Sequence, residues 1–287
     1  MRQEAITVEN LCYRYGKLTA VDDISFHVAR KEIMGFLGPN GAGKSTTVKV
    51  LTGQLKPQEG RVILLGMDVI KDIDKVQSRI GVCFEQPNLY EQMSALENLE
   101  LFARIFGLRG FDGFALLKRV GLEGREKDRV VNYSKGMKQR LMVARSLVNQ
   151  PEVLFLDEPT SGLDPVSADS IRNLILAERE RGATVFLTTH DMWEADKLCD
   201  RVAFLNQGKI ASLDTPHNLK QKYGHRSLSV KVAEDGKLKE RIISLDNPDT
   251  SEAVRDLFSR EKIVTVHSQE ATLEDIFLKV TGRRLHE

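Results

Sequence analysis

The stretch Gly38–Thr46, GPNGAGKST, constrains this chain more than any other. It matches the pattern Gly, any four residues, Gly, Lys and then Ser or Thr. Glycines at this spacing let backbone N–H groups close around phosphate oxygens, and a following helix points its N-terminus at the anion. An apolar run typical of a buried strand precedes the motif (EIMGFLG), and a helical pattern follows it (KSTTVKVLTGQL). Because the motif and its flanks agree, we expect a phosphate-binding loop rather than a chance glycine-rich turn.

Apolar runs alternate with helical patterns beyond this loop. Two more buried strands are expected at EVLFLDEP and ATVFLTTH, and the segment between them has helical spacing that ends at Gly182. This alternation favours an α/β fold with a largely parallel sheet. Residues from about 87 to 132 show helical periods with no strand between them. We interpret them as a helical insert in a first domain that covers residues 1–222.

The pattern changes in residues 223–287. Strand-like segments (SLSVKVAE, RIISLD and KIVTVHS) are mixed with helix-like ones (SEAVRDLFSR and TLEDIFLKVTG). Thr272 and Asp275 resemble a capping box at a helix start. We expect a small C-terminal α+β domain, joined to the first through the polar stretch HNLKQKYGHR.

Composition excludes several classes of protein. The 42 Lys and Arg nearly balance the 41 Asp and Glu, so no broad nucleic-acid surface and no nucleic-acid partner are expected. The three cysteines are scattered, which is typical of small buried side chains in a reducing compartment. The first residues, MRQEAITVEN, contain no apolar signal core, so secretion is not expected. No apolar run approaches the ~18–20 residues that span a bilayer, so any membrane role must act through a partner.

Two carboxylates follow one of the buried strands. Asp157 and Glu158 come directly after apolar residues, at the sheet edge where ligands of open α/β sheets bind. Asp157 would hold Mg²⁺, and Glu158 would act as a general base on an attacking water. An exposed acidic pair at a loop start is the alternative. The phosphate-binding loop in the same chain favours the catalytic interpretation.

A second Ser/Gly turn lies in VNYSKGMKQR. Ser134 and Gly136 stand at the start of the expected helix KQRLMVARSLVN. A hydroxyl and free N–H groups at a helix N-terminus suit a phosphate group. Taken alone, Ser134 would be a simple helix cap.

Together these motifs resemble the nucleotide-binding subunits of ATP-binding cassette (ABC) transporters over roughly residues 3–220. YSKGM is similar to the family signature LSGGQ. The resemblance implies a P-loop NTPase fold of ABC type, with ATP and Mg²⁺ as cofactors. It also implies that two such domains pack head to tail, so that the signature of one covers the ATP of the other. Tyr133, Lys135 and Met137 depart from the usual signature, and Lys135 replaces a glycine with a positive charge.

The resemblance extends to further positions. Asp164 in SGLDP would contact the partner protomer, His190 in TTHD would contact the γ-phosphate, and Tyr15 in CYRYG would stack on adenine. For Tyr15, an ordinary surface-strand tyrosine is the alternative. The expected catalytic residues are Lys44, Glu158 and His190, and the expected metal ligands are Ser45, Asp157 and Gln86. The expected nucleotide-binding residues are Tyr15, Gly38, Pro39, Asn40, Gly41, Ala42, Gly43, Lys44, Ser45, Thr46, Glu85, Gln86, Ser134, Gly136 and Asp164.

One loop departs clearly from the family. Members usually carry a glutamine directly after residues like the GVCF here, whereas this chain has Glu85 followed by Gln86. A glutamine would ligate Mg²⁺ through a neutral carbonyl, and a glutamate would add negative charge beside the phosphates. Both residues stay candidates for this position.

The C-terminal part resembles an extension found on ATPase subunits of some bacterial and archaeal exporters of drugs, polysaccharides or sodium, most closely at ATLEDIFLKVTGRRL. We therefore expect an ATPase that works as a homo- or heterodimer, peripheral at the cytoplasmic face of the membrane, and powers export through permease subunits. A soluble cassette ATPase in assembly or nucleic-acid maintenance is the alternative. A regulatory ATP-binding module without turnover is less consistent with the intact Lys44, Asp157, Glu158 and His190.

Overall fold

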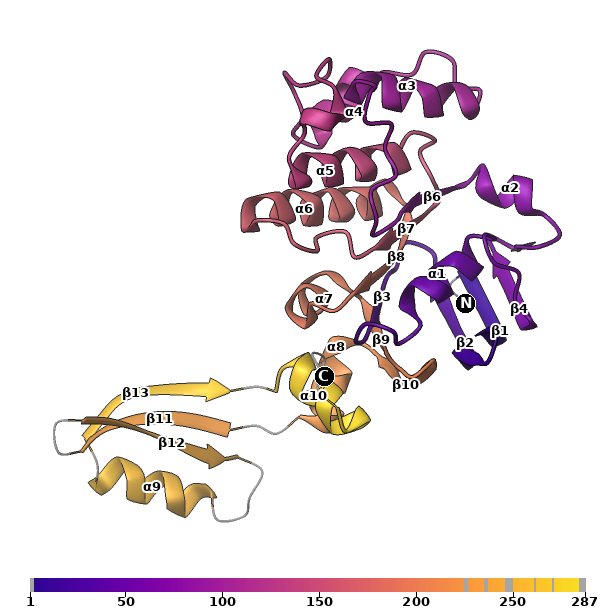
Figure 1. Ribbon diagram of the computed structural model, residues 1–287. Helices are drawn as coiled ribbons and strands as arrows, with labels where there is room; N and C mark the ends of the chain where they lie inside the picture. The colour runs from indigo at the N-terminus through magenta and orange to yellow at the C-terminus, as the bar shows by residue number, and fades with distance from the viewer. Residues whose placement is uncertain are drawn as a thin grey trace. The chain divides into compact units, whose positions relative to one another are not determined.

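The computed structural model describes residues 3–224, 227–234, 237–245, 250–260, 262–269 and 271–283 (Figure 1). The chain divides into two compact units, Met1–Leu213 and Asp214–Glu287. The division lies slightly before residue 222, where the sequence pattern changes.

The central sheet of the first unit has the strand order β10-β9-β3-β8-β7-β6. The bounds are β3 Ile33–Leu37, β6 Ile80–Cys83, β7 Val153–Asp157, β8 Thr184–Thr189, β9 Arg201–Asn206 and β10 Lys209–Asp214. The neighbours β3–β8, β3–β9, β6–β7 and β7–β8 are parallel. Strands β3, β7 and β8 are buried along their whole length, as their continuous apolar runs predict. Their carboxyl ends therefore meet at one edge of the sheet.

A second sheet packs against the first and was largely unforeseen. Its order is β2-β1-β4-β5, with β1 Glu4–Tyr15, β2 Leu18–Ala29, β4 Glu59–Leu64 and β5 Met67–Asp68. Phe26 of β2 lies 4.9 Å from Phe36 and 6.0 Å from Phe186, measured between ring centroids. These aromatic contacts join the two sheets in one core and hold β2 against the central sheet.

The helices of the first unit follow their local signals. Their bounds are α1 Lys44–Leu51, α2 Ile73–Gln77, α3 Ala95–Ile105, α4 Gly113–Arg119, the 3-10 turn η1 Val130–Asn132, α5 Lys135–Ser146, α6 Pro165–Arg181 and α7 Met192–Leu198. Helix α6 ends at Gly182, whose φ of 111° is open to glycine and strained for other residues. Helices α3 and α4 lie together beside α5 (Figure 1) and occupy the region interpreted as a helical insert.

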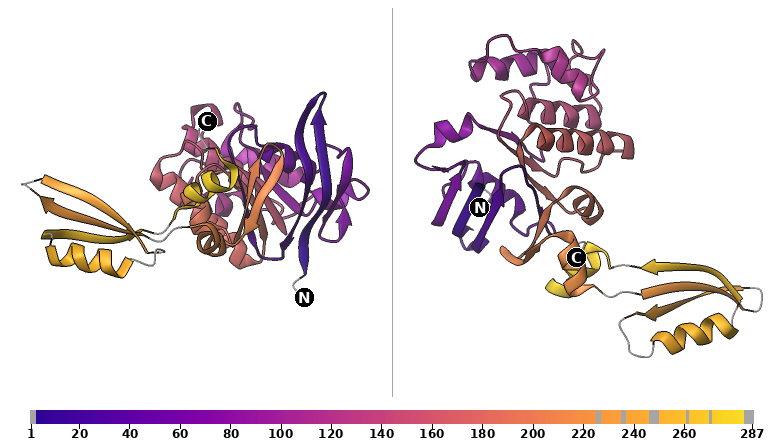
Figure 2. Two further views of the ribbon diagram at one scale, coloured as in Figure 1. Left: turned by 90° about the horizontal axis from the view of Figure 1, so that it is seen from below. Right: turned by 180° about the vertical axis from the view of Figure 1, so that it is seen from behind.

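The second unit contains a sheet in the order β12-β11-β13, antiparallel throughout. Its elements are α8 Pro216–Tyr223, β11 Ser227–Glu234, β12 Lys237–Ser244, α9 Thr250–Arg260, β13 Lys262–Gln269 and α10 Leu273–Thr281. Helix α9 lies along one face of the sheet (Figure 2), where Leu257 packs on Val230 and Val232. The capping box of Thr272 and Asp275 is present at the start of α10.

The polar stretch expected to join the domains is mostly helix α8. Thr215 caps this helix, Pro216 occupies its first turn and Leu219 is fully buried. Helix α8 packs on α10, whose residues lie some fifty positions further along the chain. His225 and Arg226, the last residues of that stretch, lie outside the described residues.

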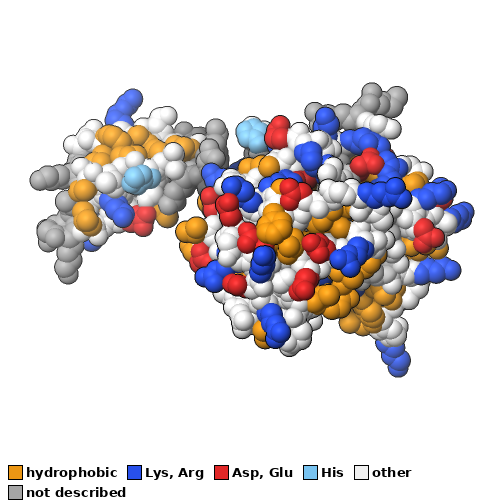
Figure 3. All heavy atoms as spheres, turned by 90° about the horizontal axis from the view of Figure 1, so that it is seen from above, with side chains coloured by type: hydrophobic (Ala, Val, Ile, Leu, Met, Phe, Trp, Pro, Cys, Tyr) orange, Lys and Arg blue, Asp and Glu red, His pale blue; other side chains and the backbone are white. Residues whose placement is uncertain are grey.

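The surface and the cysteines agree with the composition. Lys and Arg side chains are interspersed with Asp and Glu over the face of the larger unit seen in Figure 3. Cys12, Cys83 and Cys199 are buried and free, and burial raises the pKa of the Cys83 thiol to about 12. In the part of the chain that the structure describes, no helix is long and apolar enough to cross a membrane.

Candidate functional site

The glycine-rich loop runs from the end of β3 to the start of α1, as the sequence predicts. Gly43 has a φ of 105°, and a Cβ built on it would lie 2.2 Å from the carbonyl oxygen of Ala20. At Gly38, a Cβ would lie 2.3 Å from the carbonyl oxygen of Leu205. The loop thus closes tightly against the β1–β2 side and against β9, which only glycine permits.

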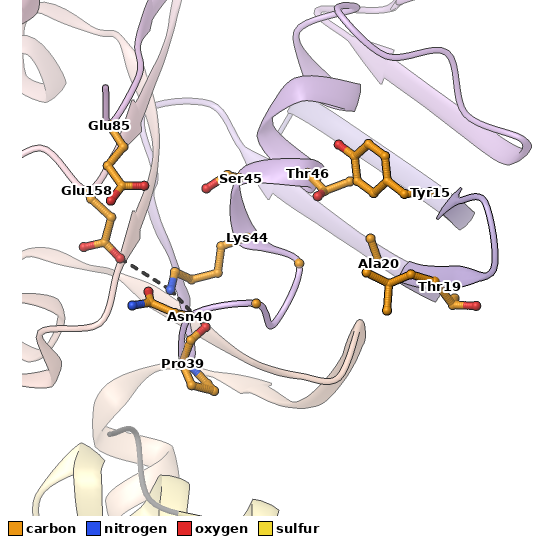
Figure 4. Close-up of a pocket in the computed structure, with 13 residues that line it drawn as sticks. Tyr15, Thr19, Ala20, Pro39, Asn40, Lys44, Ser45, Thr46, Glu85 and Glu158 are labelled. Atoms are coloured by element: carbon orange, nitrogen blue, oxygen red, sulfur yellow. Dashed lines mark hydrogen bonds and ion pairs between the residues drawn. The ribbon is translucent and has the colours of Figure 1, made fainter. Parts of the chain in front are cut away.

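Lys44 is the first residue of α1 and is buried although it is charged. Its Nζ donates hydrogen bonds to the carbonyl oxygens of Gly38 (2.6 Å) and Pro39 (3.3 Å). The same nitrogen lies 3.4 Å from Oε1 of Glu158. Figure 4 shows the lysine pointing from the loop toward this glutamate. A cation is therefore held inside the loop, next to a carboxylate that directly follows β7.

Asp157 ends β7 and meets α1 and β8. Its Oδ1 accepts hydrogen bonds from the hydroxyls of Ser45 (3.2 Å) and Thr188 (2.5 Å). A carboxylate beside a serine hydroxyl is the kind of oxygen donor set that Mg²⁺ takes together with phosphate oxygens. The residues present therefore fit a magnesium ion.

Glu158 is buried at the first position after β7 and adopts a φ of 51°, unusual for a residue with a side chain. Its N–H faces the carbonyl oxygen (3.1 Å) and the hydroxyl (3.2 Å) of Thr188. Its Oε2 lies 2.8 Å from Nδ1 of His190. Its Oε1 accepts no hydrogen bond from any described residue. The carboxylate is thus oriented by His190 on one oxygen and faces Lys44 with the other.

Lys44, Ser45 and Glu158 line a pocket of about 370 Å³. Asp157 and His190 do not line it but contact Ser45 and Glu158, respectively. Figure 4 shows Glu158 and Glu85 on one side of the loop and Tyr15, Thr19 and Ala20 on the other. The lining comprises Tyr15, Leu18, Thr19, Ala20, Pro39, Asn40, Gly41, Gly43, Lys44, Ser45, Thr46, Glu85 and Glu158. Tyr15 is 45% exposed, which leaves it accessible to a ligand.

Several residues of the site were not predicted from the sequence. Leu18, Thr19 and Ala20 enter the pocket because β2 turns back directly after Tyr15. Thr188 could have been suspected, since it directly precedes the Thr189–His190 pair at the end of the same strand. Its contact with Asp157 depends on the pairing of β7 with β8, which no local pattern reveals.

Other expected residues lie elsewhere. Gln86 lines a second pocket of about 350 Å³, which shares Glu85 and Glu158 with the first and also includes Lys135 and Ser161. Among the described residues, those that line the first pocket do not include Ser134, Gly136 or Asp164.

Two of these residues act as helix caps. Ser134 Oγ accepts a hydrogen bond from the N–H of Met137 (3.3 Å) at the start of α5. Asp164 Oδ1 accepts the N–H groups of Val166 (3.1 Å) and Ser167 (3.0 Å) at the start of α6. Hydrogen bonds from the Ser167 side chain and backbone lower the pKa of Asp164. In a single chain, these capping residues and the pocket of Lys44 are separate features.

Comparison with known proteins decides the family. The family model described as ABC transporter matches residues 21–161. The fluoroquinolones export ATP-binding protein of Mycobacterium tuberculosis is 45% identical over 98% of this chain and 95% of its own length. The chain belongs to the ATP-binding subunits of ABC transporters. The daunorubicin resistance ATP-binding protein DrrA3 of Streptomyces coeruleorubidus is 36% identical over 100% of this chain and 99% of its own length.

Solved structures of ABC subunits share the fold. An ATP-binding subunit of an ABC transporter matches with a TM-score of 0.71 and 29% identity, over 76% of this chain and 93% of its own. A dimeric ATP-binding cassette bound to ADP and Pi in a post-hydrolysis state matches with a TM-score of 0.67 and 28% identity, over 73% of this chain and 98% of its own. The P-loop fold of ABC type is thereby confirmed, and the chain is an ATP-binding ATPase of a transport system.

Proposed function

We propose that the chain is an ATP-hydrolysing subunit that dimerises head to tail and powers export through a separate membrane permease. The observation that carries the proposal is that Lys44 and Glu158 line the pocket next to each other, with His190 behind them in contact with Glu158. A buried carboxylate with an orienting imidazole and a nearby lysine is suited to activate water next to a phosphate group.

Each residue has a proposed role. Lys44 exchanges its contacts with Gly38 and Pro39 for the β- and γ-phosphates of ATP. Glu158 accepts a proton from the attacking water, and His190 holds Oε2 of Glu158 so that Oε1 stays turned toward Lys44 and the site. Ser45 and Asp157, with Gln86 as a further candidate, would hold Mg²⁺, which when bound neutralises phosphate charge.

The rest of the pocket binds the nucleotide. The backbone N–H groups of Gly38–Thr46 surround the phosphates, and Tyr15 offers its exposed ring to the adenine. Glu85 lies at the edge of this pocket and also lines the neighbouring one.

A composite site accounts for Ser134, Gly136 and Asp164. Ser134 and Asp164 are exposed at helix starts, and none of the three lines the pocket of its own chain. In a head-to-tail dimer, Ser134 and Gly136 would face the γ-phosphate held by the partner's loop, and Asp164 would contact the partner. The second subunit is either another copy or a related chain.

The names of the relatives support export. They include proteins for export of fluoroquinolones and Nod factor and for transport of bacitracin. Because these cargoes differ while the ATPase subunits stay alike, we infer that permease subunits select the cargo. We place the chain at the cytoplasmic face of the membrane as a peripheral subunit. We assign residues 1–222 to the nucleotide-binding domain, with its insert at about 87–132, and residues 223–287 to an accessory domain.

The test is Glu158→Gln. The amide keeps the hydrogen bond to His190 but cannot accept a proton, so ATP turnover should fall by roughly 10²–10⁴-fold. Binding of ATP should persist, and dimers should accumulate with ATP because they are no longer resolved by hydrolysis. Turnover is followed by phosphate release and dimer formation by light scattering after size exclusion.

Glu123→Gln is the matched control, because Glu123 is an exposed glutamate whose ion-pair partner among the described residues is Lys118. It should behave as the wild type in both measurements. Wild-type turnover by the Glu158→Gln protein would contradict the assignment of the base, and absence of ATP-dependent dimers would contradict the composite site.

A further inference from the structure

Glu194 on α7 is a buried carboxyl group that lies outside the pocket described above. Its side chain is almost fully buried. Oε2 accepts hydrogen bonds from the hydroxyls of Thr160 (2.8 Å) and Thr189 (3.3 Å). Oε1 is buried and has no hydrogen-bond partner in the described parts of the chain. Burying a carboxyl oxygen that has no hydrogen-bond partner costs folding free energy. A role of this group in the function would account for that cost.

The two hydroxyls belong to the two loops that carry the catalytic pair. Thr160 lies two residues after Glu158 in the loop that follows β7. Thr189 ends β8 and directly precedes His190. Its Oγ1 also accepts the N–H of Asp191 (3.0 Å), so it fixes the backbone on the far side of His190 as well. One carboxyl oxygen therefore joins both loops just beyond the contact between Glu158 and His190.

This connection reaches a residue in a strained backbone conformation and a partly exposed histidine. Glu158 adopts a left-handed backbone conformation, which persists only where its surroundings hold it. The side chain of His190 is 41% exposed, so packing alone does not fix its position. Thr188 ties Asp157 and the N–H of Glu158 to β8 on the strand side. Glu194 connects the same two segments from α7, through its hydrogen bonds with Thr160 and Thr189.

We propose that Glu194 is a positioning residue for ATP hydrolysis, which holds His190 against Glu158 by accepting hydrogen bonds from Thr160 and Thr189. The proposal rests on the roles given above to Glu158 and His190. Because Glu194 touches neither of them directly, it acts through the two threonines. Burial is the largest influence on its ionisation and raises the pKa of Glu194. Both hydrogen bonds to Oε2 come from neutral hydroxyl groups, so the property that the proposal requires is an acceptor oxygen at this place.

The test compares variants that differ only in that acceptor. Glu194→Leu removes it at similar volume, whereas Glu194→Gln keeps an acceptor oxygen. Thr160→Val removes one donor hydroxyl without changing the side-chain volume much, and Thr160→Ser keeps the hydroxyl. For each full-length variant, kcat, the dissociation constant of ATP and the melting temperature are measured.

We expect kcat to fall by roughly tenfold to a hundredfold in Glu194→Leu and Thr160→Val, which is the size of effect of a slightly misplaced catalytic group. The dissociation constant of ATP should stay at the wild-type value, because the loop Gly38–Thr46 is untouched. Glu194→Gln and Thr160→Ser should restore most of the lost kcat. If Glu194→Leu does not fold, the Thr160 pair decides the question alone.

Two results would overturn the proposal. One is wild-type kcat in folded Glu194→Leu or Thr160→Val protein. The other is an equal loss in the leucine and glutamine variants, or in the valine and serine variants, which would show that the acceptor and donor do not matter. Glu158→Gln is assayed in parallel. Wild-type turnover by that variant overturns the proposed function itself, so the two failures are distinguishable.

Discussion

Gly43 shows how a single residue holds the phosphate-binding loop in place. Its φ of 105° is strained for any side chain, and an added Cβ would meet the carbonyl oxygen of Ala20. Gly41 also has a positive φ, of 80°, but no described atom lies within 4 Å of a Cβ built there. Both glycines therefore adopt a positive φ, but only Gly43 lacks room for a Cβ atom.

This difference makes a prediction. Gly43→Ala should lower the free energy of unfolding by about 1–3 kcal/mol, or more if the β1–β2 turn cannot move, and should weaken ATP binding. Gly41→Ala, the matched control, should show only the smaller cost of its backbone conformation. Urea unfolding and nucleotide titration measure both effects. Equal losses in the two variants would show that the contact with Ala20 is unimportant.

Residues of the site were predictable where chemistry and local pattern coincide. Lys44 and Ser45 begin the helix that follows the glycine-rich motif, and Asp157 and Glu158 stand at the end of an apolar strand run, so their places could be read from the sequence. The hydrogen-bond partners of these residues could not be predicted from the sequence. The ties of Thr188 to Asp157 and of Glu194 to Thr160 join residues about thirty positions apart, and only the pairing of β7 with β8 brings them together.

At the scale of elements, the start of α5 is anchored by a residue that departs from the family signature. Tyr133 is buried, and its hydroxyl donates a 2.6 Å hydrogen bond to the carbonyl oxygen of Arg125. Burial raises the pKa of Tyr133 to about 12, and the charges of Asp128 and Glu126 add to this effect. A tyrosine here ties α5 to the loop after α4, which an aliphatic residue could not do through a hydrogen bond.

Tyr133 therefore predicts a specific alkaline dependence. The protonated phenol is favoured in the folded chain, so its contribution to stability is complete below the ordinary tyrosine pKa of 10.0 and is lost as pH rises toward about 12. Tyr133→Phe should cost about 1 kcal/mol at neutral pH through the lost hydrogen bond. The gap between variant and wild type should close above pH 10, measured by urea unfolding at a series of pH values. A gap that widens above pH 10 would contradict this account.

Elements were predictable where signals are local. The strands β3, β7 and β8 follow from continuous apolar runs, and α6 from its acidic cap at Asp164 and its terminal Gly182. The antiparallel sheet β2-β1-β4-β5 was missed because its strands are irregular in burial and interrupted by bulges. Helix α8 looked like a polar connection because its burial depends on α10, far along the chain.

At the scale of the whole molecule, the first unit alone contains every residue that lines the pocket of Lys44. The similarity to the fluoroquinolone and daunorubicin relatives nevertheless covers nearly the entire chain, so the second unit is part of what these relatives share. The near-equal numbers of acidic and basic residues give no indication of a broad nucleic-acid surface. These features favour a membrane complex over a soluble cassette ATPase.

The most direct test of the central claim is to purify the tagged full-length protein from gently solubilised native membranes and to identify its partners by mass spectrometry. The account predicts a stoichiometric partner with several membrane-spanning segments, whose presence stimulates ATP turnover that depends on Glu158. Lys44→Ala protein should recover the same partner without that turnover. Recovery from the cytosol alone, with soluble partners or none, would contradict the transport function and favour the soluble ATPase.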